Sequence, residues 1–269
     1  MTHVVRAFLA YLRAAIGVMF QYRGEILLWA IWGLINPAVL YAMWSSAAEG
    51  NPGGEAAGFT RGQFAAYYFI IMIVGHLATA WDVYEMGYMI RTGKLSPLLL
   101  RPILPIWKSL AENVAYKIAT LLFVVPMWCI FAWLVTPTFD TAMWQFGLGA
   151  AAVLLAAALN FILGYVVSLV AFWVTKLDAL GEVYFGLGMF LGGRFAPLDA
   201  LPEPVRWIAD GLPFRWMFAF PAELLMGRIT SQTEALAGIG IQAAWIVCII
   251  VAFKILWTVA VKRHAAVSG

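Results

Sequence analysis

Long apolar runs separated by short polar segments make up most of this chain. A helix needs about 20 apolar residues to cross a bilayer, and six spans can be drawn on that basis. The fifth is the weakest, because it holds only 11 uncharged residues and is rich in glycine. The six predicted spans are Ile26–Trp44, Phe64–Trp81, Ile118–Phe139, Thr141–Thr175, Val183–Gly193 and Ala235–Phe253. The pattern predicts an all-α integral membrane protein, with residues 1–269 forming one domain.

The first 25 residues have a different pattern. Apolar side chains recur there at helical spacing, while Arg6 and Arg13 share the opposite face. The apolar positions are Val5, Phe8, Leu9, Leu12, Ile16, Met19 and Phe20. Residues 1–25 are therefore predicted to form an amphipathic helix in the membrane interface. Such a helix could be a passive anchor or a lever on cytoplasmic machinery.

A basic segment, Tyr88–Leu110, separates the second and third predicted spans. It contains four basic residues, three prolines and no acidic residue, so it is too charged to cross. Ser96 can cap a short helix that starts at Pro97 and runs through Leu100, before Pro102 stops it. We expect a rigid element on the cytoplasmic face that docks a partner, although a topology signal alone would also explain the charges.

Between the fifth and sixth predicted spans lies region 194–234. Its apolar run, Trp216–Met226, is 11 residues long and bounded by Arg215 and Arg228. Four prolines precede it, which favours a re-entrant hairpin on the outer face over a seventh span. Irregular backbone survives at membrane depth only when protein buries it.

Composition and charge agree with a membrane protein. Charged residues make up 12% of the chain and the mean hydropathy is +0.86, whereas soluble domains carry about 25% charged residues. With six spans, 12 of the 17 Lys and Arg residues, including every lysine, fall on the side of the two termini and 5 on the other. The positive-inside rule then predicts that both termini are cytoplasmic. A net charge of +3 gives no reason to expect nucleic acid as a partner.

No enzyme signature is present. Of the three histidines only His76 falls in a span, with no second ligand at metal-binding spacing. It is expected to be a packed, hydrogen-bonded residue. Asp82 and Glu85 are expected to be solvated at the end of the second span. Because no GxxxxGK[ST] pattern occurs, any ATP used must bind another chain, and no cofactor or metal is predicted here.

Three stretches resemble the permease subunits of ABC-2 exporters, and most closely a bacterial subgroup with about 260 residues and six spans. They are Tyr22–Trp29, Ile90–Pro105 and Leu201–Ile229. The resemblance implies two permeases, identical or different, with two cytoplasmic ATP-binding subunits that hold ATP and Mg²⁺, in a bacterial inner membrane. It also implies that the basic segment carries the ATPase-coupling helix. Leucines would then make the apolar contacts while basic residues steer docking or meet lipid headgroups: Leu98, Leu99, Leu100, Arg91, Lys94 and Arg101.

In such folds the translocation route lies between the two permeases and is lined partly by the first span. This resemblance makes four residues substrate-path candidates: Trp29, Trp32, Asn36 and Tyr41. An aromatic face with one buried amide and a break at Asn36–Pro37 would suit a hydrophobic or amphipathic compound, including a cationic one. Lipid-facing aromatics beside a kink are the other interpretation.

Other functions remain open from the sequence. Glycolipid or polysaccharide export is the main alternative substrate class. A secondary carrier would be expected to show membrane-embedded charges or broken helices repeated in both halves, and an intramembrane enzyme would need paired catalytic groups. Neither pattern is clear in the sequence.

Overall fold

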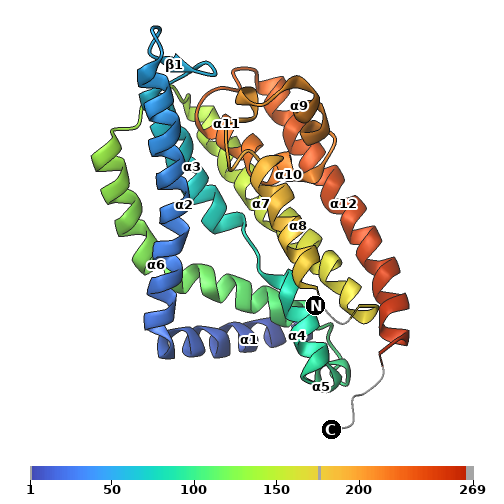
Figure 1. Ribbon diagram of the computed structural model, residues 1–269. Helices are drawn as coiled ribbons and strands as arrows, with labels where there is room; N and C mark the ends of the chain where they lie inside the picture. The colour runs from blue at the N-terminus through green and yellow to red at the C-terminus, as the bar shows by residue number, and fades with distance from the viewer. Residues whose placement is uncertain (1, 175–176, 265–269) are drawn as a thin grey trace.

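The computed structural model describes residues 2–174 and 177–264, and helices form most of it (Figure 1). Thr175 and Lys176, the end of the fourth predicted span and one basic residue, lie outside the described residues. The helices are α1 (Thr2–Gln21), α2 (Arg23–Gly50), α3 (Arg61–Ala78), α4 (Asp82–Arg91), α5 (Leu95–Leu99), α6 (Ile106–Val135), α7 (Met143–Ser168), α8 (Asp178–Phe190), α9 (Glu203–Asp210), α10 (Pro213–Met217), α11 (Ala219–Leu225) and α12 (Gln232–Lys262). Short 3-10 turns (η1, Leu169–Phe172; η2, Leu198–Ala200) and a two-stranded hairpin (β1, Glu55–Ala56; β2, Phe59–Thr60) complete the fold.

Within the described residues, six helical segments are long and apolar enough to cross a membrane. They are His3–Gln21, Gly24–Gly50, Arg61–Arg91, Ile106–Val135, Met143–Phe172 and Gln232–Lys262. The predicted class, an all-α membrane protein with six spans, is confirmed. The set of segments differs from the prediction at one position: α8 has 13 residues, about 20 Å of helix, against a hydrocarbon core of about 30 Å. The predicted fifth span is thus shorter than a bilayer core, and α1 is the sixth segment that meets the criteria of length and apolar composition.

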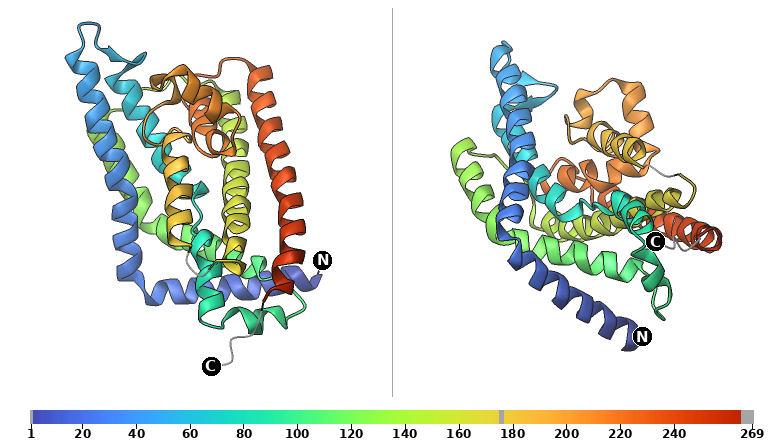
Figure 2. Two further views of the ribbon diagram at one scale, coloured as in Figure 1. Left: turned by 45° about the vertical axis from the view of Figure 1, so that its right-hand side comes forward. Right: turned by 60° about the horizontal axis from the view of Figure 1, so that its bottom comes forward.

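The orientation of α1 nevertheless fits a helix lying in an interface. Figures 1 and 2 show it lying across the lower ends of the other helices, beside the first half of α6, rather than alongside them. Arg101, which follows α5, donates a hydrogen bond to the Tyr11 hydroxyl of α1 at 2.8 Å. This contact connects the predicted interfacial helix to the predicted coupling segment.

The segment Arg61–Arg91 is not one continuous helix. Residues 79–81, the end of the second predicted span, separate α3 from α4, and Thr79 adopts an extended backbone there. Helix α3 begins at a capping box formed by Thr60 and Gln63 and forms the centre of the molecule, with Phe64, Tyr67 and Tyr68 fully buried. The predicted break at Asn36–Pro37 is absent, because α2 continues through Pro37.

Region 194–234 folds into short helices and turns at the end of the bundle opposite α1 (Figure 1). Helices α10 and α11 have five and seven residues, so neither part of the run Trp216–Met226 can cross a membrane. Met217, Ala219, Ala222 and Leu224 are fully buried. The seventh-span alternative is excluded, and the irregular backbone is covered by protein as expected.

Candidate functional site

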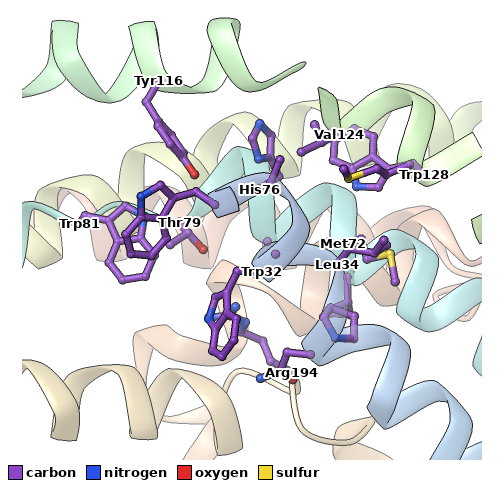
Figure 3. A pocket seen from close by; sticks show the side chains of 18 of the residues that line it. Trp32, Leu34, Met72, His76, Thr79, Trp81, Tyr116, Val124, Trp128 and Arg194 are labelled. Atoms are coloured by element: carbon purple, nitrogen blue, oxygen red, sulfur yellow. The ribbon is translucent and has the colours of Figure 1, made fainter. Parts of the chain in front are cut away.

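A cavity of about 170 Å³ lies between α2, α3, α6 and the turn that follows α8 (Figure 3). Side chains that are far apart in sequence meet there. The lining residues include Trp29, Trp32, Asn36, Met72, His76, Thr79, Trp81, Tyr116, Val124, Trp128 and Arg194. Most of this wall is aromatic or aliphatic, so it offers an apolar environment with few polar groups, as small-molecule sites do.

Three of the four substrate-path candidates lie on this wall. Trp29, Trp32 and Asn36 are spaced three and four residues apart on α2, which places them on one helix face. All three line the cavity, and their place on a substrate path stays a prediction. Asn36 is exposed in the single chain, so this chain alone does not bury the amide.

Tyr41, the fourth candidate, does not line this cavity. Its ring is buried edge-on against Phe131, with the centroids 5.7 Å apart. Its hydroxyl accepts a hydrogen bond from Nε of Arg61 at 3.4 Å. Five residues beyond Asn36, the helix has turned Tyr41 towards α3 and α6 rather than towards the cavity.

His76 forms one corner of the cavity. Its Nε2 lies 3.1 Å from Oγ1 of Thr120, and that hydroxyl already donates to the carbonyl of Tyr116 at 2.7 Å. Because a hydroxyl has one proton to donate, Nε2 of His76 is assigned as the donor to Thr120. The ring packs edge-on against Trp128 at 5.6 Å. His76 is the packed, hydrogen-bonded residue that the sequence predicted.

The break between α3 and α4 exposes polar groups to the cavity. The carbonyl of Ala78 loses its helical partner and accepts a hydrogen bond from Nδ2 of Asn160 on α7 at 3.0 Å. The Thr79 hydroxyl is buried and has no hydrogen-bond partner within the described residues. Trp81 packs between Trp29, at 6.0 Å, and Phe185, at 5.1 Å. The interruption is therefore supported by other helices, and it leaves a hydroxyl available beside the cavity.

The turn after α8 places Arg194 in the cavity wall, at the lower side in Figure 3. Hydroxyls of Tyr67 and Tyr68 on α3 donate to the carbonyls of Gly193 and Phe195, at 2.6 and 2.8 Å. The Trp44 indole of α2 donates to the same Phe195 carbonyl at 3.1 Å. Three donors from the core thus hold the carbonyls of the residues on either side of Arg194. No pattern in the sequence predicted that Arg194 joins the site.

A second cavity, of about 190 Å³, adjoins the first and shares Trp81 and Tyr116 with it. Its other lining residues are acidic or polar: Asp82, Glu85, Ser109, Glu112 and Asn113. Asp82 is buried, and its Oδ2 has no hydrogen-bond partner within the described residues. The expectation that Asp82 is solvated at a helix end is therefore wrong, because protein covers the first turn of α4, where Val83 is also buried.

The predicted coupling segment contains a helix of five residues, α5. It begins one residue before Ser96, which does not cap it; the Ser96 hydroxyl instead lies 3.0 Å from Nε2 of His264. The three leucines differ in exposure: Leu98 is 7% exposed and packs in the core, Leu99 is partly buried, and Leu100 is 88% exposed. They do not form one exposed apolar patch.

Three of the four basic residues of this segment, Arg91, Lys94 and Arg101, are exposed. Nζ of Lys94 donates to the Tyr88 hydroxyl at 2.7 Å, and this hydrogen bond raises the pKa of Lys94. Lys94 therefore keeps its positive charge at physiological pH. Arg91 is also exposed, with its guanidinium close to Gly87, and Arg101 is held by Tyr11.

A family model described as "ABC-2 family transporter protein" matches residues 34–268. No curated protein and no solved structure matches the chain. The match covers α2 from Leu34 onward and every described helix after it, including the segment with α5; of the cavity wall it leaves out the part of α2 that carries Trp29 and Trp32.

Proposed function

The chain belongs to the ABC-2 family of transporter proteins, and from this premise we propose that it is the permease subunit of an exporter. It moves a hydrophobic or amphipathic compound outward. Separate cytoplasmic subunits bind ATP and Mg²⁺ and supply the energy, because the sequence holds no nucleotide-binding motif of its own.

The aromatic cavity is the observation that supports this substrate class. Trp29, Trp32, Trp81 and Trp128 surround it, and tryptophan rings take up apolar and amphipathic groups well. At about 170 Å³, the cavity is smaller than the 300–1,000 Å³ of typical ligand pockets. Trp32 is 67% exposed. Both features fit a site that a second permease completes, so a dimer is part of the proposal.

The segment with α5 is the proposed contact with the ATPase. Leu100 offers an exposed apolar side chain, and Lys94 and Arg101 offer positive charges beside it. Because the helix is preformed and Arg101 is held by Tyr11, docking would order few groups and would cost little conformational entropy.

Transport in inverted membrane vesicles tests the proposal. The chain would be expressed with the ATP-binding subunits that co-purify with it, and ATP-dependent uptake would be followed for three probes: dansyl-labelled undecanoic acid, its methyl ester and the corresponding amine. We expect uptake of at least one probe, and a loss of about tenfold in Trp32→Ala, equivalent to about 1.4 kcal/mol. Trp207→Ala is the control, since Trp207 is 71% exposed on α9 and does not line the cavity.

Three results would contradict this function. Uptake that needs an ion gradient instead of ATP would indicate a secondary carrier. Robust ATP hydrolysis by the purified chain alone would contradict a separate ATPase. Absence of uptake for all three probes, combined with loss of a surface polysaccharide on gene deletion, would identify glycan export.

A further inference from the structure

Arg194 is the basic side chain that the fold places in the wall of the aromatic cavity. Its position is fixed by backbone as well as by hydrogen bonds. Gly193 has φ +75, and a Cβ there would lie 2.8 Å from the Tyr67 hydroxyl and 2.9 Å from Cβ of Ala219. The turn thus has one tight geometry, and the three donors from α2 and α3 hold it. The backbone that carries the Arg194 side chain is therefore preorganised, which lowers the entropy cost of binding a ligand.

Arg194 has no acidic partner within the described residues, unlike Arg215 and Arg228 of the same region. Arg215 is paired with Asp210 and with Glu223, the latter at 3.1 Å, and Arg228 lies 3.7 Å from Asp199. The guanidinium of Arg194 instead lies over the ring of Phe218, 5.0 Å from its centroid. Stacking occupies one face of the guanidinium and leaves its N–H edge, a fork that matches carboxylate and phosphate oxygens, available.

The rest of the wall complements such a contact. None of the described residues that line this cavity is a carboxylate, and the Thr79 hydroxyl beside it is buried without a partner. Aromatic rings fill most of the remaining surface. Arg194 is partly buried, and a charge partly removed from water without a counter-charge is costly, so an anion that enters with an apolar body would relieve that cost.

We propose that this cavity selects amphipaths that carry an anionic group, a carboxylate or a phosphate, with Arg194 binding the anion and the tryptophans packing against the apolar part. The proposal rests on the export function above and narrows its substrate class. It also excludes the cationic compounds that the aromatic face of the first span would accept, because Arg194 would repel a cation.

The adjoining acidic cavity does not remove this selectivity. Glu112 is paired with Lys108 at 2.6 Å, and Asp82 and Glu85 belong to the lining of the other cavity, across the shared residues Trp81 and Tyr116. If those carboxylates dominated recognition, a cationic amphipath would bind best. The experiment therefore includes a matched cation.

Equilibrium binding of the three dansyl probes decides between these outcomes. The purified complex would be placed in nanodiscs of neutral phosphatidylcholine, without ATP, and titrated with the acid, the ester and the amine. We expect the acid to bind at least about tenfold tighter than either counterpart, as a charge-assisted hydrogen-bond pair would give. Arg194→Gln should abolish this preference, and Arg194→Lys should keep part of it, because lysine retains the charge without the planar fork.

Arg206→Gln is the matched control, since it removes the same charge from α9, outside the cavity, and should leave the preference intact. A competition experiment then distinguishes an anionic lipid from a free anionic amphipath as the ligand. Displacement of the acid probe by added phosphatidylglycerol identifies a membrane lipid headgroup as occupant, and resistance to displacement identifies a free amphipath.

Equal binding of the acid and the ester by the wild type, tighter binding of the amine, or an acid preference that survives in Arg194→Gln would overturn the proposal. The wild-type comparison holds even if Arg194→Gln fails to assemble. ATP-dependent uptake of the ester or amine with no preference for the acid would contradict this inference and leave the exporter in place. Absence of any ATP-dependent uptake would contradict the exporter function. The equilibrium binding of the acid, ester and amine would still test whether the cavity prefers an anion.

Discussion

Gly193 carries a backbone torsion on which the charged side of the cavity depends. Its φ of +75 lies in the left-handed region, where a side chain is strained. The neighbouring atoms also leave no room for one, since an added Cβ would come within 3.0 Å of both Tyr67 and Ala219. The residue allows the chain to turn from α8 into the core, so that Arg194 meets helices that precede it by more than 100 positions.

Gly193→Ala is predicted to destabilise the protein by about 1–3 kcal/mol, the usual cost of a strained backbone torsion with steric overlap. The readout is the unfolding temperature of the purified protein, followed by tryptophan fluorescence. Gly186→Ala, within α8, is the control: nothing lies within 4 Å of its added Cβ, and alanine is favoured in helices by about 1 kcal/mol. Equal stability of the two variants would contradict this account of the turn.

At the scale of elements, the leucines of the segment with α5 fall into a buried group and an exposed residue. Leu95 and Leu98 pack into a core cluster with Met86, Tyr165 and Leu177. Leu100 follows the helix and points away from this cluster, with 88% of its surface exposed. A five-residue helix forms few hydrogen bonds of its own, so the buried leucines and the prolines around it hold it in place.

Leu100→Ser is therefore predicted to leave the permease folded and membrane-inserted while co-purification of ATP-binding subunits falls several-fold, because an exposed apolar contact is lost. Leu98→Ser should instead lower the unfolding temperature, since burying a hydroxyl and removing a buried leucine costs about 2–5 kcal/mol. Co-purification and thermal unfolding would be measured on the same preparations.

The basic residues are untouched in both variants, so topology should survive in both. Wild-type co-purification and transport in Leu100→Ser would leave the segment as a topology signal. Loss of folding in Leu100→Ser would contradict the exposed position of that side chain.

At the scale of the whole molecule, the two ends of the bundle differ. The hairpin β1–β2 and helices α9–α11 gather at one end, and α1 and α5 at the other (Figure 1). The excess of basic residues predicts that the end with α1 and α5 is cytoplasmic. The energy coupling proposed above requires the same orientation, because ATP is hydrolysed in the cytoplasm.

A membrane-impermeant maleimide added to intact spheroplasts tests this orientation. In a background where Cys129 and Cys248 are replaced by alanine, Gly53→Cys should be labelled and Leu100→Cys should be protected until the membrane is opened. Gly53 is exposed in the turn before β1, with nothing within 4 Å of an added Cβ. The reverse labelling pattern would contradict cytoplasmic termini and the coupling role of α5.

Properties that depend on neighbours in sequence could be predicted from the sequence. Long apolar runs determine the class, an all-α membrane protein, because only internally hydrogen-bonded helices are stable in lipid; the short fifth predicted span is the one that the sequence alone placed wrongly. Prolines and basic residues place a short helix between the second and third spans, and the spacing of Trp29, Trp32 and Asn36 places them on one face. Local periodicity determines each of these features.

Tertiary structure decided the rest. The break at Thr79 depends on Asn160 of α7, the turn at Arg194 depends on Trp44, Tyr67 and Tyr68, and the burial of Leu98 depends on a cluster from other helices. A hydrogen bond between residues more than 80 positions apart leaves no periodic trace in the sequence. The sequence alone therefore predicted an aromatic face on the first span. The position of Arg194 in the same cavity wall depends on the packing of distant helices.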